Sequence, residues 1–215
     1  MEFKYAIFDM DGTVLDSIPY WENLGLDFLA EKGIVGPEDL NDRMASMSLS
    51  EAAVFLKEEF GLKEDAETIH QGACERIERC YAELVGLKPG AEAYIRFLKG
   101  KGVSLCVATA SALSLVQPAL EHNGILSCFD FLLDCAMAGA GKTKPHIYQM
   151  AARQFGAEPS ECVVIEDSAY ALRTAKEAGF WTIGVYEPSE KEEELARKYS
   201  DRYVMELGEL LAEDQ

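Results

Sequence analysis

Apolar and polar positions alternate in two different ways along the chain, and the change of pattern divides it. From Pro89 onward, short apolar runs alternate with longer stretches in which apolar residues recur every three or four positions. The apolar runs predict strands, and the longer stretches predict helices, in the order 91–101 (helix), 103–108, 112–123 (helix), 129–133, 145–156 (helix), 162–165, 168–178 (helix) and 181–185. This alternation predicts a parallel sheet with helices on both faces.

The segment from residue 17 to about 82 has no such strands. Its apolar residues form three stripes, which are Trp21, Leu24, Phe28 and Leu29, then Phe55, Leu56 and Phe60, then Ile69, Ala73, Ile77, Cys80, Tyr81 and Leu84. Burial of one helix face explains such stripes better than contacts to a cofactor do. We therefore predict an all-helical domain at 16–82, inserted into an α/β core formed by 1–15 and 83–215.

One more apolar run, Tyr5 to Phe8, leads into Asp9-Met10-Asp11-Gly12. The run predicts a strand buried on both faces, and period-two geometry places Asp9 and Asp11 on the same side of the extended chain. Ligands of open α/β sheets bind at the carboxyl ends of strands. A surface turn is the structural alternative. A calcium loop is excluded, because it needs a bidentate Glu at its twelfth position, where Tyr20 stands.

Later segments bring polar side chains to the same edge of the predicted sheet. The run that ends at 108 leads into Thr109-Ala110-Ser111, and the run 162–165 leads into Glu166-Asp167-Ser168. Between them, Gly141-Lys142-Thr143-Lys144 places cations before a helix. Each group alone is explained by a helix cap or a solvated lysine. Acids, a hydroxyl and a lysine at one sheet edge together predict a functional site.

Composition and charge limit the partners of such a site. The 215 residues suffice for one sizeable core and a small second domain. A net charge of −18 disfavours nucleic acid and anionic membranes, so an anionic small molecule needs a metal ion or a local lysine. We find no signal segment or apolar stretch of membrane-spanning length, and we expect a cytoplasmic location. The oligomeric state stays open, and a monomer is compatible with the sequence.

These motifs resemble those of the haloacid dehalogenase-like superfamily, in its phosphatase and β-phosphoglucomutase-like branch with a helical cap. The resemblance spans nearly the whole chain. It rests on four motifs in order, which are Asp9-Met10-Asp11-Gly12-Thr13-Val14-Leu15-Asp16-Ser17, Thr109, Lys142 and Glu166-Asp167-Ser168. It implies a Rossmann-like, doubly wound parallel sheet with an inserted all-helical cap domain.

The resemblance also implies a mechanism, in which the chain hydrolyses a small phosphorylated metabolite. Asp9 would attack phosphorus to form an aspartyl-phosphate, and Asp11 would protonate the leaving oxygen and then activate water. The implied substrate-binding residues are Gly12, Thr109, Ala110, Lys142 and Trp21. The implied Mg²⁺ ligands are Asp9, the backbone carbonyl of Asp11, Asp167, and Glu166 either directly or through water.

Several alternatives accompany this interpretation. The third motif departs from the family pattern, so Lys144 is the alternative to Lys142. Residues 139–143 look like part of a nucleotide-binding loop, but Ala136 stands where that loop needs glycine. A sugar-phosphate mutase is disfavoured, because Trp21 and a position near Ser48 replace the histidine and arginine of the mutase cap. A non-catalytic binding protein would have no need of Asp11 as a proton donor.

Overall fold

The computed structural model describes residues 3–44 and 47–213, and the chain forms two compact units. The sheet unit comprises the chain up to Asp16 and from Gly86 onward, and the helical unit is Ser17–Val85. The predicted helical insertion, 16–82, begins one residue earlier (16 against 17) and ends three residues earlier (82 against 85). The later end has a physical cause, because residues 86–88 pair with residues 14–16. The Asp16 N–H donates to the Gly86 carbonyl, and the Lys88 N–H donates to the Val14 carbonyl, each at 2.9 Å.

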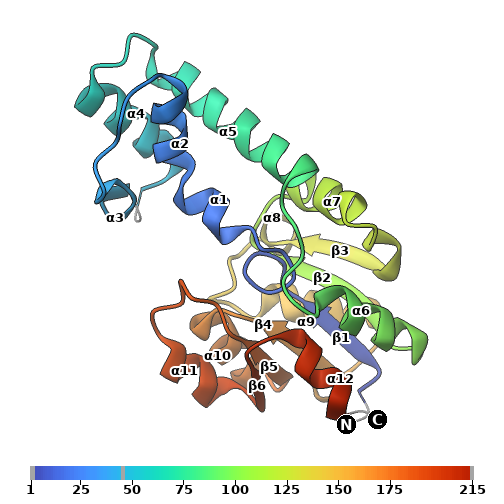
Figure 1. Cartoon of the computed structure of the whole chain (residues 1–215). Coiled ribbons are helices and arrows are strands. Elements are labelled where there is room, and N and C mark those ends of the chain that lie inside the picture. The colour runs from blue at the N-terminus through green and yellow to red at the C-terminus, as the bar shows by residue number, and fades with distance from the viewer. Residues whose placement is uncertain (1–2, 45–46, 214–215) are drawn as a thin grey trace. The chain divides into compact units, whose positions relative to one another are not determined.

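Six parallel strands form the sheet, in the order β3-β2-β1-β4-β5-β6 (Figure 1). They are β1 (Tyr5–Phe8), β2 (Ser104–Thr109), β3 (Phe131–Asp134), β4 (Cys162–Glu166), β5 (Trp181–Val185) and β6 (Arg202–Val204). The predicted class, a Rossmann-like doubly wound α/β fold, is confirmed. The strand order reverses beside β1, and this reversal places the carboxyl end of β1 at the crevice where such sheets bind ligands.

Helices connect the strands of this sheet. They are α6 (Ala91–Gly100), α7 (Leu113–His122), α8 (Cys135–Ala138), α9 (His146–Phe155), α10 (Ala169–Glu177), α11 (Glu193–Tyr199) and α12 (Leu210–Glu213), with short 3₁₀ turns at Leu126–Cys128, Pro159–Glu161 and Leu207–Glu209. Crossovers between parallel strands are right-handed, so α6 and α7 lie on one face while α9, α10 and α11 lie on the other. The sheet is therefore covered on both faces, as predicted.

Packing explains why these strands are apolar on both faces. Ile7, Cys106 and Val164 from three neighbouring strands belong to one buried cluster with Ile147 and Ala151 of α9. On the intervening positions, Ala6, Leu105 and Val163 are buried as well. Residues buried on both sides of a parallel sheet cannot alternate with polar ones, which is why the strands appear as continuous apolar runs in the sequence.

The helical unit contains α1 (Ile18–Glu22), α2 (Leu24–Glu31), α3 (Leu40–Met44), α4 (Leu49–Phe60) and α5 (Ala66–Glu83). Its core includes Phe28, Leu29, Leu56 and Ile69 from the three predicted stripes. Two details of the stripes are wrong. The first stripe spans a break at Asn23 between α1 and α2, and Leu84 lies beyond the end of α5 and is 57% exposed.

The sequence patterns did not predict β6 or α8, which have three and four residues. Both elements are too short for a periodic pattern of apolar residues to be recognised in the sequence. Among the helices formed by the described residues, none is both long and apolar enough to cross a membrane.

Candidate active site

Asp9 stands at the carboxyl end of β1, directly after Phe8. Its backbone N–H donates to the Ile165 carbonyl at 2.9 Å, so the pairing of β1 with β4 continues through Asp9 and fixes its backbone. The Asp9 side chain is buried and forms an ion pair with Lys142. Lys142 Nζ also lies 2.7 Å from Glu166 Oε2. The predicted nucleophile, the predicted lysine and one predicted metal ligand therefore meet in one buried cluster.

Two acids at the end of β4 complete this cluster. Asp9, Glu166 and Asp167 each offer a carboxylate oxygen, and these oxygens lie within 4.8 Å of one another. Thr13 Oγ1 donates to Asp167 Oδ1 at 2.9 Å, and the Tyr148 hydroxyl lies 3.4 Å from Glu166 Oε2. Three buried oxygen ligands at this spacing form a candidate site for a metal ion.

Burial and like charge shift the pKa values of these groups. Burial, together with the Glu166 carboxylate, raises the pKa of Asp9 from its ordinary 3.8 to about 7. Burial, with Glu166 and Asp9, holds the pKa of Asp167 well above its usual range. Burial opposes the charge of Lys142, but Asp9 and Glu166 outweigh it and keep the pKa of Lys142 well above its usual value. When all three acids are ionised, their negative charge exceeds the single positive charge of Lys142, and a divalent cation would neutralise this excess.

The end of β2 brings two further predicted residues together. Thr109 is fully buried, and its Oγ1 accepts a hydrogen bond from the Ser111 N–H at 3.0 Å. Ser111 Oγ donates to Asp11 Oδ2 at 2.5 Å. Asp11 and Thr109, assigned to proton transfer and phosphate binding, are thus linked through one serine. Ala110 lies between Thr109 and Ser111 in the chain.

The two lysines of the third motif differ sharply. Lys142 is 4% exposed, whereas Lys144 is exposed.

The nucleotide-binding-loop alternative fails, because that loop must follow a strand, and Gly139 instead ends α8. Trp21 lies in the helical unit, where its Nε1 donates to the Tyr81 hydroxyl at 2.7 Å. The assignment of Trp21 to substrate binding stays a prediction.

Sequence reasoning did not assign Thr13, Tyr148 or Ser111 to the site. Thr13 and Ser111 lie inside or next to the recognised motifs, so their position was a usable signal. Tyr148 is different, because it occupies an apolar stripe of α9 that periodicity assigns to the core. Burial and contact with Glu166 raise its pKa well above the usual value, so its hydroxyl stays protonated and able to donate to Glu166.

Gly12 lets the turn after β1 approach the acids closely. Its φ is +84°, and a Cβ placed there would lie 2.5 Å from Asp167 Oδ2. Gly33 has φ +73° with no atom within 4 Å of such a Cβ. We expect Gly12→Ala to displace the Asp167 carboxylate and to destabilise the protein by clearly more than the roughly 1 to 2 kcal/mol that positive φ alone costs an alanine. Gly33→Ala is the matched control, and urea unfolding of both variants measures the difference. Equal losses would contradict the close approach of Gly12 to Asp167.

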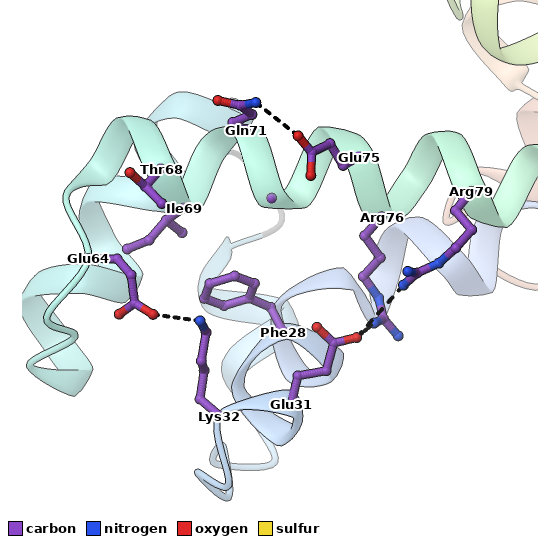
Figure 2. A pocket seen from close by; sticks show the side chains of 11 residues that line it. Phe28, Glu31, Lys32, Glu64, Thr68, Ile69, Gln71, Glu75, Arg76 and Arg79 are labelled. Atoms are coloured by element: carbon purple, nitrogen blue, oxygen red, sulfur yellow. Dashed lines mark hydrogen bonds and ion pairs between the residues drawn. The ribbon is translucent and has the colours of Figure 1, made fainter.

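A hollow lies on the helical unit, between α2 and α5, with a volume of about 430 Å³ (Figure 2). Lys32 at its rim lies 2.5 Å from Glu64, and Arg76 lies 2.8 Å from Asp27. Figure 2 shows Glu31 reaching toward Arg76 and Arg79 from the opposite wall. Carboxylates of the same unit thus already neutralise these cations, and the groove is a poor alternative site for a phosphate group.

Comparison with known proteins relates most of the chain to haloacid dehalogenase-like hydrolases, among them a phosphatase, and to a phosphoglucomutase. The sequence profile of a family described as haloacid dehalogenase-like hydrolase matches residues 3–179. A phosphorylated carbohydrates phosphatase of Thermotoga maritima is 28% identical, with 81% of each chain covered. A beta-phosphoglucomutase of Bacillus subtilis is 27% identical over 85% of this chain and 83% of its own. The crystal structure of CbbY from Rhodobacter sphaeroides, in complex with phosphate, is 26% identical with a TM-score of 0.75, covering 97% of this chain and 96% of that one.

Proposed function

Since the chain belongs to the haloacid dehalogenase-like hydrolase family, we propose that it is a Mg²⁺-dependent phosphatase that hydrolyses a small phosphorylated metabolite through an aspartyl-phosphate on Asp9. One observation carries the proposal, which is the buried Asp9 carboxylate paired with Lys142 beside Asp167 and Glu166. The relatives named above favour a sugar phosphate as the substrate.

The donor set fits magnesium. Mg²⁺ prefers hard oxygen ligands, and three carboxylate oxygens within 4.8 Å of one another supply them. Asp9, Asp167 and the backbone carbonyl of Asp11 would hold the ion. One oxygen of Glu166 already faces Lys142 and Tyr148, so its other oxygen would serve the ion directly or through water. When bound, Mg²⁺ would polarise the phosphoryl group and stabilise the charge that develops on it in the transition state. Bound metal ions contribute on the order of several kcal/mol in this way.

The chain's own groups would perform the two chemical steps. A carboxylate oxygen of Asp9 attacks phosphorus while the bond from phosphorus to the ester oxygen breaks, and Asp11 gives its proton to the leaving alcohol. Asp11 then takes a proton from water, whose oxygen attacks the phosphorus of the aspartyl-phosphate. The bond from phosphorus to the Asp9 oxygen breaks, which releases inorganic phosphate and restores the Asp9 carboxylate. Lys142 and the Thr109 hydroxyl would bind the phosphoryl oxygens throughout, because both are donors fixed by burial.

Magnesium binding should depend on pH in a defined direction. The pKa of Asp9 rises from 3.8 to about 7 on folding. Between these two pH values the metal-free folded protein keeps the Asp9 proton, whereas the unfolded chain releases it. The free energy of unfolding of the metal-free protein therefore falls as the pH rises from 3.8 to about 7. Mg²⁺ needs the ionised ligands. We therefore expect Mg²⁺ to raise Tm more at about pH 8 than at about pH 5.5. Thermal unfolding with and without Mg²⁺ measures this, and Asp167→Asn should shrink the gain at both pH values. A larger gain at the acidic pH would contradict the proposed ligands.

A sugar-phosphate mutase is the second candidate, favoured by the similarity to the Bacillus subtilis enzyme. Ser48 caps α4 through a reciprocal pair of hydrogen bonds with Glu51, and neither residue is a cation that would bind a second phosphate. Phosphorus NMR of glucose 1-phosphate with Mg²⁺ separates the candidates. We expect inorganic phosphate to accumulate. Formation of glucose 6-phosphate without phosphate release would establish the mutase instead.

A further inference from the structure

We propose that Ser111 is a positioning residue that holds Asp11 for proton transfer, an inference that rests on the proposed function. Its hydroxyl donates to Asp11 Oδ2 at 2.5 Å, between residues 100 positions apart in the sequence. Hydrogen bonds from hydroxyl to carboxylate are short and strong. This contact joins the loop after β2 to the loop after β1.

The sheet makes this contact a consequence of the fold. Strands β1 and β2 are parallel neighbours, with Phe8 opposite Val107. Asp11 and Ser111 lie three and four positions beyond this pair, so both emerge at the same edge of the sheet. Each is only half-buried, so hydrogen bonds as well as packing constrain the Asp11 side chain.

Proton transfer explains why such a constraint matters. Asp11 has to lie within hydrogen-bond reach of the leaving oxygen when the ester bond breaks. A half-buried aspartate side chain can adopt several staggered conformations, and the hydrogen bond from the Ser111 hydroxyl restricts them. We call this hydrogen bond the tie to Asp11. Removing this hydrogen bond lowers the fraction of molecules in which Asp11 is correctly placed, and this loss slows only the steps in which Asp11 gives or takes a proton.

The Ser111 backbone makes a separate contact that a side-chain substitution leaves intact. Its N–H donates to Thr109 Oγ1 at 3.0 Å, which leaves the hydrogen of the Thr109 hydroxyl available for a phosphoryl oxygen. Ser111→Ala therefore removes the tie to Asp11 and keeps the orientation of Thr109. Ser111→Thr keeps both.

The test compares two esters with different leaving groups, in the full-length protein with Mg²⁺. A hexose phosphate has an alkoxide leaving group that needs a proton, whereas 4-nitrophenyl phosphate has an activated one that does not. The value of kcat/KM reports the steps up to release of the leaving group. We expect Ser111→Ala to lower kcat/KM about tenfold or more for the hexose phosphate and less than about threefold for 4-nitrophenyl phosphate. Ser111→Thr should recover most of the wild-type ratio of kcat/KM for the hexose phosphate to kcat/KM for 4-nitrophenyl phosphate.

Other outcomes would overturn the inference in distinguishable ways. An equal loss for both esters would assign Ser111 to phosphate binding or to the fold in general. No loss would show that proton transfer by Asp11 does not depend on the Ser111 hydroxyl. A Ser111→Thr variant with the same ratio as Ser111→Ala would also reject the role of the hydroxyl. In each of these cases the wild type still works, so the proposed function stands. A wild type that hydrolyses neither ester would remove the proposed function and this inference with it.

Discussion

Replacing Asp9 by asparagine is expected to abolish phosphate release while leaving the fold at least as stable as the wild type at about pH 8. An amide cannot form the aspartyl-phosphate, so we expect kcat to fall by about 10⁴-fold or more. The stability prediction has a separate cause. Burial and the neighbouring Glu166 raise the pKa of Asp9 to about 7, which means that the metal-free fold disfavours the ionised carboxylate above that pH. The neutral amide removes this unfavourable charge.

The exposed Asp39 offers a matched control for Asp9→Asn. Asp39→Asn makes the same chemical change far from the acid cluster in sequence and is expected to leave kcat and Tm close to wild type. Phosphate release with Mg²⁺, and Tm without it, should be measured for both variants. If Asp9→Asn kept a rate within tenfold of the wild type, Asp9 would not be the nucleophile.

Replacing Lys142 by methionine is expected to have the largest effect on stability. The lysine is 4% exposed and pairs with both Asp9 and Glu166, so its loss leaves two buried carboxylates without their cation. Removing one partner of a buried ion pair costs about 3 to 5 kcal/mol. We expect a loss of this size in the free energy of unfolding of the metal-free protein, together with a fall in kcat/KM of about 100-fold or more.

Lys144→Met is the matched control for Lys142→Met, and it decides between the two lysines of the third motif. Lys144 is exposed, so its replacement should change the free energy of unfolding by less than about 0.5 kcal/mol. Urea unfolding and kcat/KM for a sugar phosphate measure both effects. A variant at Lys144 that lost activity while Lys142→Met kept it would reverse the assignment of the phosphate-site lysine.

The regular elements of the sheet unit were predictable because each shows one simple pattern of apolar residues. Strands such as β4 are buried on both faces and form continuous apolar runs, and helices such as α9 show one apolar stripe. The three-residue strand β6 was not predictable, because only Val204 in it is buried. The break at Asn23 was missed for a related reason, since α1 and α2 share a spacing that also fits one longer helix.

The site was predictable to the extent that backbone topology determines it. Asp9 follows β1, while Thr109 and Glu166 are the last residues of β2 and β4. The carboxyl ends of such parallel strands meet at one edge of the sheet. Lys142 follows a helix, α8, and only its spacing in the family pattern indicated that it reaches Asp9. The tie from Ser111 to Asp11 depends on side-chain conformations in two different loops, which no periodicity encodes.

A crystal structure of the protein grown with Mg²⁺ and beryllium fluoride would test the central claim most directly. Beryllium fluoride mimics a phosphoryl group bound to a carboxylate. We expect it on an oxygen of Asp9, with the Mg²⁺ ion in contact with Asp9 and Asp167 and with Lys142 alongside. Beryllium fluoride on another carboxylate, or a cation bound away from Asp9 and Asp167, would contradict the proposed phosphoryl-transfer site.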